Sequence, residues 1–274
     1  MIRSVTSRRN ATALADWRQH LQAAGRSPGT VEQYESYLSR FLTADRTSYD
    51  VTVDDIEGWL AAHPSWSAPS RRVAANALAS FYGWAHQTGR IEHDPTVTLE
   101  RARIRRPVPK PTPDDVLAAA ISTATGDDRW LLRIAASTGL RRAELAELHS
   151  AQVEHHPDGW WLRVVGKGDQ ERLIPLPEDL AGWIRHRRGW AFPSKRKRGR
   201  HELPPSIGKR IKRLLGGWSA HTLRHYYATT TYQSTGDLYA TQRLLGHASP
   251  VTTQGYVMES PARLREAAAA AWVA

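Results

Sequence analysis

The chain has 274 residues, no cysteine, and 38 lysines and arginines against 27 aspartates and glutamates, for a formal net charge of +11. This length allows two ordinary domains, the charge indicates a polyanionic partner, and the lack of cysteine excludes disulfides and thiolate metal sites. Since no apolar run approaches the roughly 20 residues that span a bilayer and residues 1–10 lack a secretion signal, we expect a cytoplasmic nucleic-acid-binding protein without a membrane partner.

The first hundred residues carry the apolar spacing of amphipathic helices. Apolar side chains recur every three or four residues in four stretches, at 14–21, 31–42, 56–60 and 73–84. Thr52 can cap the third stretch, Ser67 or Pro69 can open the fourth, and Gly89 can end it. This pattern predicts a helical domain over residues 1–100, in which the aromatic side chains pack.

Residues 101–113 interrupt the helical pattern with alternating basic residues and prolines. Prolines keep such a segment extended, so the basic side chains stay in water. We expect an interdomain linker that lies against a phosphate backbone, and the alternative is a solvated spacer. The basic residues are Arg101, Arg103, Arg105, Arg106 and Lys110.

Residues 114–274 form the second expected domain. Helical stretches near 113–124 and 130–137 precede two β-rich runs, 160–165 and 171–175, which a glycine-containing loop joins as a hairpin. The remainder reads as helical and ends in the alanine-rich tail 261–274. The predicted fold class is therefore mainly α with a small β-hairpin or sheet, with the four-helix domain followed by a mixed α/β domain.

Arg141 is a candidate phosphate ligand. It follows Thr138-Gly139-Leu140, where a loop turns into a helix expected to end near Leu148. A guanidinium can hold two phosphate oxygens at once, and Glu144 could orient it through an i, i+3 pair. For Arg141 alone, a surface salt bridge is the simpler interpretation.

A second cluster of candidates begins at Ser219, which can cap a helix, as can Thr222. His221 and Arg224 are spaced i, i+3 behind this cap and share a helix face near the positive end of its dipole. Both side chains could contact a bound phosphate. His225 follows directly, and we assign it a supporting, buried position.

Three further side chains could complete a phosphodiester site. Lys167, flanked by glycines at the hairpin tip, could serve as a general acid, although lysines are common at such tips. Tyr256 follows the polar run 249–255 and is favoured as nucleophile over four rivals, Tyr226, Tyr227, Tyr232 and Tyr239. The first two follow His225 directly, where aromatic residues usually pack. The phenol needs a nearby base or cationic field, which His247 and the arginines could provide.

Metal and nucleotide cofactors are not expected. The sequence has no HExxH motif, no clustered carboxylates and no GxxxxGK[ST] loop. Further basic residues are candidates for DNA binding, although basic runs are usually solvated surfaces. They are Arg71 and Arg72 in the first domain, and Lys195 and Arg196 in the run Lys195–Arg200.

This ordered set resembles the tyrosine recombinases, the family of phage integrases and bacterial site-specific recombinases. Thr138-Gly-Leu-Arg141, Gly166-Lys-Gly168, the HxxR spacing of His221 and Arg224, and Leu245-Gly-His247 carry the resemblance, together with Tyr256. The resemblance implies a nucleophile, Tyr256, and five other catalytic residues: Arg141, Lys167, His221, Arg224 and His247. It also implies that the first domain is a core-binding domain, in a simple type without an arm-binding domain.

The activity implied is site-specific DNA recombination. Tyr256 would form a 3′-phosphotyrosyl link, and two strand exchanges through a Holliday junction would recombine two duplexes without a cofactor. Implied partners are double-stranded DNA at attachment or core sites and a homotetramer of the chain, with a directionality factor as a further possibility. The tail 261–274 is expected to dock on a neighbouring subunit.

The biological setting we favour is integration or excision of a phage or prophage. Resolution of chromosome dimers or transposon intermediates is the alternative within the family. A type IB topoisomerase shares this chemistry, and a telomere resolvase is disfavoured by the short chain. A DNA-binding accessory protein with a decayed site is the alternative from another class, and the complete set of candidates argues against it.

Overall fold

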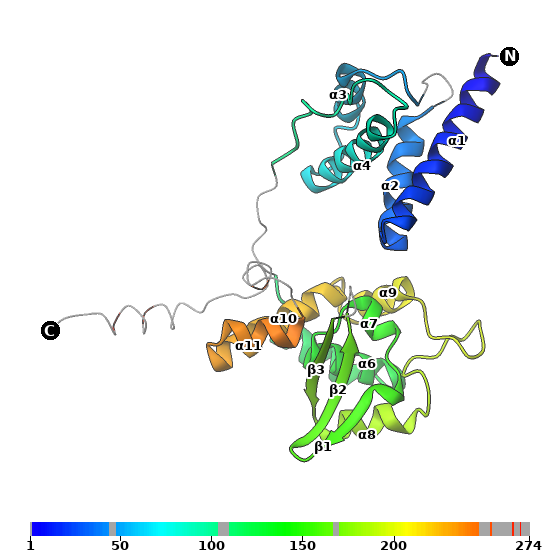
Figure 1. Ribbon diagram of the computed structural model, residues 1–274. Coiled ribbons are helices and arrows are strands. Elements are labelled where there is room, and N and C mark those ends of the chain that lie inside the picture. The colour runs from blue at the N-terminus through cyan, green and yellow to red at the C-terminus, as the bar shows by residue number, and fades with distance from the viewer. Residues whose placement is uncertain are drawn as a thin grey trace. The chain divides into compact units, whose positions relative to one another are not determined.

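The computed structural model describes residues 2–43, 48–103, 110–166 and 170–246, with residues 253, 265 and 269, and for residues 2–7 it describes the backbone alone. The chain forms two compact units, Met1–Arg105 and Arg106–Ala274 (Figure 1). The division falls inside the segment 101–113, where the sequence predicts a linker. Within the described ranges, no helix is both long and apolar enough to cross a membrane.

The described part of the first unit contains four helices, α1 Ile2–Ala23, α2 Pro28–Phe41, α3 Val53–Ala61 and α4 Ala68–Gln87. The four predicted helices are thus confirmed. Ser27, Thr52 and Ser67 cap α2, α3 and α4, each accepting a hydrogen bond from a backbone N–H of the first turn. Gly89, just past α4, has a positive φ of 69° that glycine tolerates.

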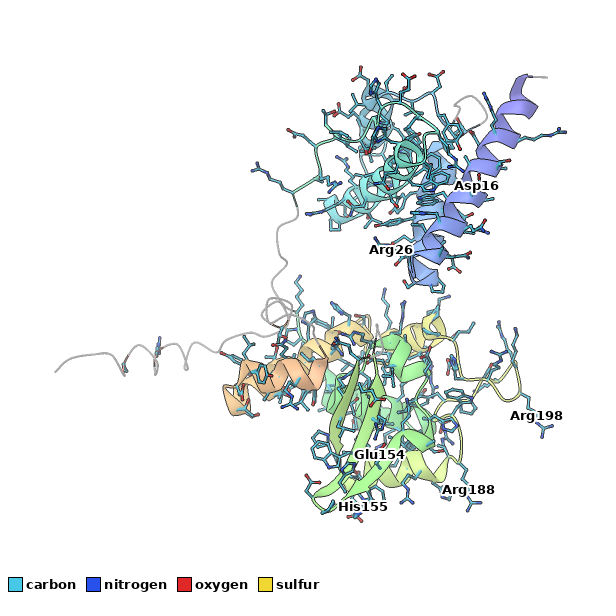
Figure 2. The ribbon with its side chains drawn as sticks, in the orientation of Figure 1. Asp16, Arg26, Glu154, His155, Arg188 and Arg198 are labelled. Atoms are coloured by element: carbon cyan, nitrogen blue, oxygen red, sulfur yellow. The ribbon has the colours of Figure 1, made fainter. Side chains whose placement is uncertain are left out.

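Aromatic side chains hold these helices together. Trp17 of α1 is fully buried and meets Phe81 of α4 edge to face, with ring centroids 5.8 Å apart. Phe41 of α2 meets Trp59 of α3 in the same way at 5.2 Å. Asp16, labelled in Figure 2, forms an ion pair with Arg90, which follows α4, at 3.2 Å. The aromatic residues pack, as the sequence predicts.

The second unit contains a three-stranded antiparallel sheet in the order β1-β2-β3, with strands Val153–His156, Gly159–Val165 and Glu171–Leu176. Strands β2 and β3 are the predicted hairpin, with Val165 opposite Glu171. Leu162 and Ile174 face the core and are fully buried. The sequence analysis missed β1, because its Val-Glu-His-His sequence has only one β-branched residue.

Helices and one 3-10 turn make up the other regular elements in the described residues of the second unit. They are α5 Asp114–Thr123, α6 Gly126–Thr138, α7 Arg142–Ala146, the 3-10 turn η1 Ser150–Gln152, α8 Glu178–His186, α9 Pro204–Leu214, α10 Ala220–Thr235 and α11 Leu238–Leu245. The helical stretches predicted near 113–124 and 130–137 are α5 and α6. Helix α7 ends at Ala146, two residues before its expected end, so it spans little more than one turn.

Helix α10 brings the candidate segments together. It packs against α6, α9 and α11, and α7 packs against α9 (Figure 1). The first turn of α10, the loop after α6 and the C-terminal end of α11 therefore lie close to one another. Four of the six predicted catalytic residues belong to these three places in the sequence.

Candidate active site

The first turn of α10 presents His221 and Arg224. Ser219 caps the helix: its hydroxyl accepts from the N–H of Thr222 at 3.3 Å, and the Thr222 hydroxyl accepts from the N–H of Ser219 at 3.0 Å. Arg224 is only 2% exposed, whereas the neighbouring His221 is exposed. The two side chains thus have the shared face that their spacing predicts, one at the surface and one beneath it.

Arg224 connects two helix ends. Its Nη1 donates to the carbonyl oxygen of Gly139 at 2.6 Å, and its Nη2 donates to that of Leu245 at 2.5 Å. Gly139 follows α6 and Leu245 ends α11. Carbonyl groups at a helix C-terminus lack donors within the helix, and a buried cation satisfies them well. The guanidinium is thereby held in a fixed position.

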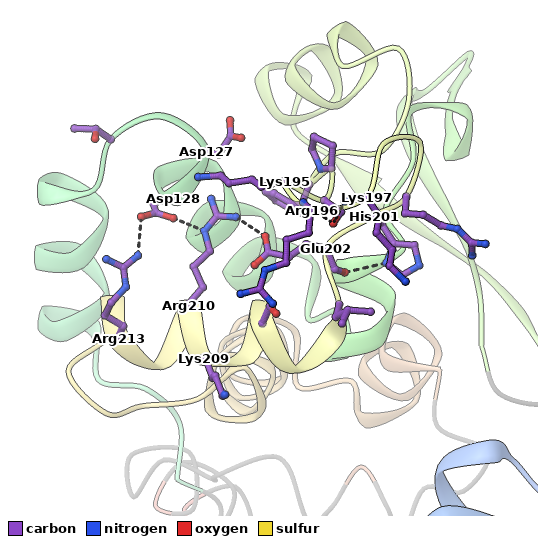
Figure 3. Close-up of a pocket in the computed structure, with 17 residues that line it drawn as sticks. Asp127, Asp128, Lys195, Arg196, Lys197, His201, Glu202, Lys209, Arg210 and Arg213 are labelled. Atoms are coloured by element: carbon purple, nitrogen blue, oxygen red, sulfur yellow. Dashed lines mark hydrogen bonds and ion pairs between the residues drawn. The ribbon is translucent and has the colours of Figure 1, made fainter.

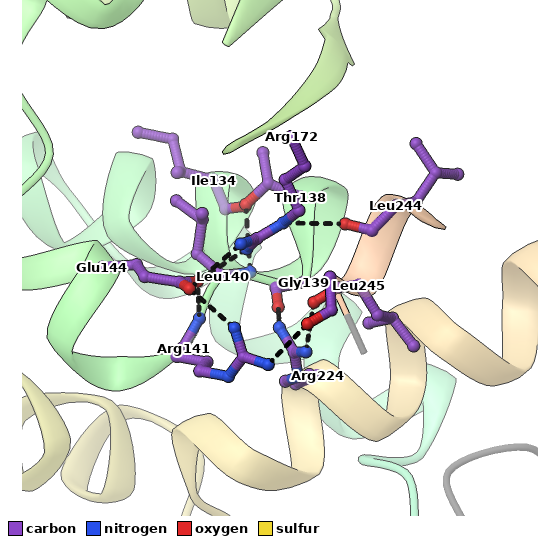
Figure 4. Close-up of polar contacts among 11 residues, drawn as sticks. Ile134, Thr138, Gly139, Leu140, Arg141, Glu144, Arg172, Arg224, Leu244 and Leu245 are labelled. Atoms are coloured by element: carbon purple, nitrogen blue, oxygen red, sulfur yellow. Dashed lines mark hydrogen bonds and ion pairs between the residues drawn. The ribbon is translucent and has the colours of Figure 1, made fainter. Parts of the chain in front are cut away.

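Arg141 is the N-cap residue of α7 and pairs with Glu144, as predicted. Its backbone N–H donates to Oε2 of Glu144 at 2.7 Å, and its Nη1 donates to Oε1 at 2.9 Å. Its Nη2 donates to the carbonyl oxygen of Gly246 at 3.0 Å (Figure 4). The Arg141 side chain is 39% exposed, so the guanidinium is oriented on one side and open to solvent on the other.

Arg141, His221 and Arg224 line one pocket of about 590 Å³. Its described lining also includes Arg142 of α7 and two lysines of α9, Lys209 and Lys212. Three arginines, two lysines and an imidazole around one hollow favour an anion with several oxygens, such as a phosphodiester. The predicted phosphate ligands from two distant segments of the sequence are therefore brought together.

The sequence analysis missed Arg172 of β3, which completes the support of Arg141. Its Nη1 and Nη2 donate to Oε1 and Oε2 of Glu144 at 3.1 and 2.7 Å, and its Nε donates to the carbonyl oxygen of Leu244 at 3.0 Å. The Glu144 carboxylate thus lies between two guanidinium groups. The alternation of β3 places Arg172 on the inward face with Ile174, and an arginine at such a position was the available signal.

Glu144 is ionised because of these two arginines. Burial by itself would raise its pKa, but hydrogen bonds and positive charge from Arg172, and hydrogen bonds from Arg141, outweigh burial and lower the pKa from 4.5 to about 2. The side chain is only 10% exposed. A permanent negative charge next to Arg141 fixes the plane of that guanidinium.

His221 has a neighbour in His225, whose Nε2 lies 3.2 Å from Nε2 of His221. His225 is 8% exposed, which agrees with the buried position expected for it. Partial burial and the charge of Arg224 lower the pKa of His221. His221 is therefore neutral at pH 7, and a neutral imidazole has a ring nitrogen that can accept a proton.

Lys167, His247 and Tyr256 lie outside the described residues. The residues that precede the first two are described. A Cβ atom built on Gly166 would lie 3.9 Å from Nη1 of Arg141, and one built on Gly246 would lie 2.8 Å from Cδ of Arg172. The chain on the near side of both candidates therefore adjoins the cluster of Arg141 and Arg172.

Tyr226 and Tyr227, the rival nucleophiles, pack within the second unit. Tyr227 lies against Gly139, since a Cβ atom on that glycine would be 2.4 Å from its Cδ1. Burial raises the pKa of both phenols, and contact with Asp114 raises that of Tyr226 further. A raised pKa makes the nucleophilic phenolate harder to form, so neither side chain is set up for attack.

The candidate DNA-binding arginines of the first unit differ from one another. The Nη2 of Arg71 donates to the carbonyl oxygens of His63 and Pro64 at 3.4 and 3.3 Å, whereas Arg72 is exposed. At the C-terminal end of this unit, Arg101 and Arg103 are exposed. The candidates Arg105 and Arg106 lie outside the described residues.

Lys195 and Arg196 line a second basic pocket, of about 1210 Å³, between the loop after α8 and helix α9 (Figure 3). Both side chains are exposed, and Lys209 lines this pocket as well as the first. Arg210 on the same helix also lines this pocket, but it forms ion pairs with Asp128 and, at 3.0 Å, with Glu202. One face of α9 therefore links two basic hollows.

Comparison with known sequences gives the same family. The sequence profile of the phage integrase family matches residues 114–263. Tyrosine recombinase XerC of Chromobacterium violaceum is 30% identical over 263 residues, which cover 87% of this chain and 87% of the relative. Tyrosine recombinase XerD of Pseudomonas aeruginosa is 30% identical over 262 residues, which cover 86% of each chain.

Solved structures share the fold. The lambda integrase fragment 75–356, crystallised as a dimer bound to a COC′ core site, is similar with a TM-score of 0.71 at 19% identity, over 90% of this chain and 94% of that one. A lambda integrase tetramer bound to a Holliday junction is similar with a TM-score of 0.68 at 18% identity, over 88% of this chain and 77% of that one. The chain therefore belongs to the phage integrase family and is a site-specific tyrosine recombinase.

Proposed function

We propose that the pocket of Arg141, His221 and Arg224 binds the scissile phosphate and that Tyr256 attacks it. The Tyr256 oxygen forms a bond to phosphorus, the bond to the 5′-oxygen breaks, and a 3′-phosphotyrosyl link and a free 5′-hydroxyl result. The observation that carries this proposal is the convergence of two arginines from segments 83 residues apart on one pocket with an imidazole.

The two arginines would stabilise the transition state. As the phenol adds, negative charge grows on the nonbridging oxygens, and guanidinium groups held in advance lower its energy without reorganising. Glu144 holds Arg141, and two backbone carbonyls hold Arg224. We assign His247 to the same oxygens, because it follows Gly246, whose carbonyl oxygen Arg141 contacts.

Two proton transfers balance the reaction. The phenol of Tyr256 gives up its proton. Neutral His221 can accept that proton or orient the phenol, and His225 supports the His221 ring. Lys167 supplies a proton to the departing 5′-oxygen, since an ammonium among several cations is more acidic than a free one. Because the phosphotyrosyl link retains the energy of the phosphodiester, a 5′-hydroxyl of another strand can reverse the step without ATP or metal.

Nicked suicide substrates test this assignment. DNA sites would be recovered by selection from a random duplex pool with the full chain, and an adduct would be sought on a denaturing gel for the wild type and for Tyr256→Phe. We expect an adduct in the wild type alone. An adduct that survives Tyr256→Phe would refute the assigned nucleophile, and specific binding without any adduct would favour an accessory DNA-binding protein.

We extend the proposal to the assembly. The first unit, residues 1–100, would act as the core-binding domain, with the linker 101–113 and the loop at Lys195 and Arg196 on the DNA backbone. A homotetramer would exchange strands between two sites through a Holliday junction, as the fold shared with the tetrameric lambda integrase complex supports. The tail 261–274 would dock on a neighbour, and a directionality factor in the bacterial cytoplasm could bias the outcome.

Two settings suit this reaction. Integration or excision of phage DNA is the setting that the sequence led us to favour. Resolution of chromosome dimers or transposon intermediates is the second, and the Xer names of the two curated relatives favour it. A plasmid with two directly repeated sites and a pair of plasmids with one site each separate the settings: a resolving enzyme deletes within the first, whereas an integrase also fuses the pair.

A further inference from the structure

Three successive carbonyl groups at the C-terminal end of α11 each accept a hydrogen bond from a different arginine. Leu244 accepts from Arg172 at 3.0 Å, Leu245 from Arg224 at 2.5 Å and Gly246 from Arg141 at 3.0 Å (Figure 4). The arginines come from β3, α10 and the N-cap of α7. Two of them are the proposed phosphate ligands, and the third has no such assignment.

Arg172 differs from the other two in its surroundings. Its side chain is 7% exposed, and it is not among the described residues that line the pocket of Arg141, His221 and Arg224. All three of its hydrogen-bonding nitrogens are instead engaged, two by the Glu144 carboxylate and one by Leu244. Arg172 thus contacts one group that orients Arg141 and another that belongs to the end of α11.

We propose that Arg172 is a positioning residue for the recombination reaction: it fixes the Glu144 carboxylate behind Arg141 and the end of α11 in a single rigid arrangement. The proposal rests on the proposed function, because it concerns the same pocket. Through Glu144, Arg172 sets the plane of the Arg141 guanidinium. Through Leu244, it sets where the chain leaves α11 toward His247.

The chemistry requires an arginine at this position. A planar guanidinium presents donors in a fixed fork, so one side chain can bind a carboxylate with two nitrogens and a carbonyl with the third. A lysine would keep the charge but could not hold both groups in that geometry. Gly246 packs onto the guanidinium, since a Cβ atom there would lie 2.8 Å from Cδ and 3.1 Å from Nη1 of Arg172.

The test measures DNA affinity and cleavage separately for Arg172→Lys and Arg172→Met. The probe is a nicked duplex carrying the sequence that the wild-type chain selects from a random pool. Cleavage is followed in a single turnover at saturating protein, affinity by mobility shift, and folding by thermal unfolding. Arg163→Met is the matched control, because Arg163 of β2 also bridges two carboxylates, those of Glu154 and Glu171, and lines neither basic pocket.

We expect Arg172→Met to bind DNA like the wild type and to form the adduct roughly 100-fold more slowly, as displaced catalytic groups do. Arg172→Lys should recover part of the rate, and Arg163→Met should cleave normally. The double variant Arg172→Met/Glu144→Gln should be no slower than the slower single variant, because the residues act as one unit. If Arg172→Met does not fold, the comparison of Arg172→Lys with the wild type decides.

Three results would overturn the inference. Wild-type cleavage rates in the folded Arg172 variants would show that Arg172 only stabilises the fold. A loss of affinity that accounts for the slower cleavage would make it a DNA contact. A double variant with additive losses would separate it from Glu144. Absence of an adduct in the wild type would instead refute the proposed function, and the inference with it.

Discussion

Arg224 and Gly139 are in direct contact, with 2.6 Å between Nη1 and the carbonyl oxygen. Gly139 has a left-handed φ of 59°, and a Cβ atom there would lie 2.4 Å from Cδ1 of Tyr227. A side chain is therefore excluded both by the backbone conformation and by the neighbouring ring. The position of the proposed phosphate ligand depends on a residue that has no side chain.

Gly139→Ala should consequently damage stability and cleavage together. The left-handed conformation alone costs a non-glycine residue about 1–2 kcal/mol, and displacing Tyr227 adds to it. The carbonyl group moves with the backbone, so Arg224 loses its partner and the cleavage rate falls. Denaturant unfolding and the suicide-substrate assay measure the two effects.

Gly216→Ala is the matched control for this change. Gly216 has a φ of 58°, lies in the same unit and has no atom within 4 Å of a built Cβ. The Gly216→Ala variant should lose stability through backbone strain alone, and the folded variant should cleave DNA at the wild-type rate. Equal cleavage by the two variants would contradict the role given to Gly139.

Glu144 should make the protein less stable in acid. Its pKa is about 2 in the folded chain and near 4.5 when unfolded, so its contribution is fully present above pH 5 and disappears as the pH falls toward 2. The shift corresponds to roughly 3 kcal/mol. Glu144→Gln should therefore flatten the decline of unfolding free energy between pH 5 and pH 3, measured by urea titration.

Glu154 of β1 provides the comparison for Glu144. Hydrogen bonds from Arg163, and then from His156, lower its pKa to about 2 as well, but it lies on the water-exposed side of the sheet (Figure 2). Water screens such pairs, so Glu154→Gln should change the acid dependence much less. A larger effect from Glu154→Gln than from Glu144→Gln would contradict the importance given to burial.

His221 should titrate below the usual value of 6.5. Burial and the charge of Arg224 both lower its pKa, and burial is the larger cause. We expect the midpoint in an NMR titration to rise in Arg224→Gln without reaching the ordinary value. His225, 3.2 Å away, is the other titratable group facing it, and His221→Gln identifies the resonance. A wild-type midpoint above 6.5 would contradict the lowered pKa of His221.

Tyr226→Phe and Tyr227→Phe should both retain the covalent adduct. Because the pKa of both phenols is raised, neither is expected to attack phosphorus. Tyr227→Phe keeps the ring that packs against Gly139, so it should also remain folded. Loss of the adduct in one of these variants, with unchanged DNA affinity, would identify that tyrosine and not Tyr256 as the nucleophile.

Arg71 and Arg72 are adjacent but should behave differently. Arg72 is exposed, and Arg72→Ala should weaken binding to a random duplex and reduce the salt slope by about 0.9 if it contacts one phosphate. Arg71 holds the carbonyl groups of His63 and Pro64, so Arg71→Ala should chiefly lower the unfolding temperature. A salt slope unchanged by Arg72→Ala would remove it from the DNA interface.

Local signals in the sequence were enough for most of the helices. Thr52, Ser67 and Ser219 cap helices as the sequence predicts, because capping depends only on neighbouring residues. The strand β1 was missed for the complementary reason. Its side chains have weak strand preference, and pairing with β2 determines its conformation.

The candidate site was predictable where a motif carries it and not elsewhere. Arg141, His221 and Arg224 were found from their spacing, and they do share a pocket. Arg172 was not found, because its partners Glu144 and Leu244 lie 28 and 72 residues away, and no local pattern connects them. An arginine that shares the inward face of β3 with Ile174 and Leu176 was the detectable signal.

Thr112, near the start of the second unit, is fastened to helix α10. Its N–H donates to the carbonyl oxygen of Thr222 at 3.1 Å, and the two hydroxyl groups lie 2.9 Å apart. Thr222 follows His221 directly and belongs to the capping pair of α10. A change in the backbone at Thr112 is thus passed to the residue next to His221, so the first residues of the second unit adjoin the proposed site without lining its pocket.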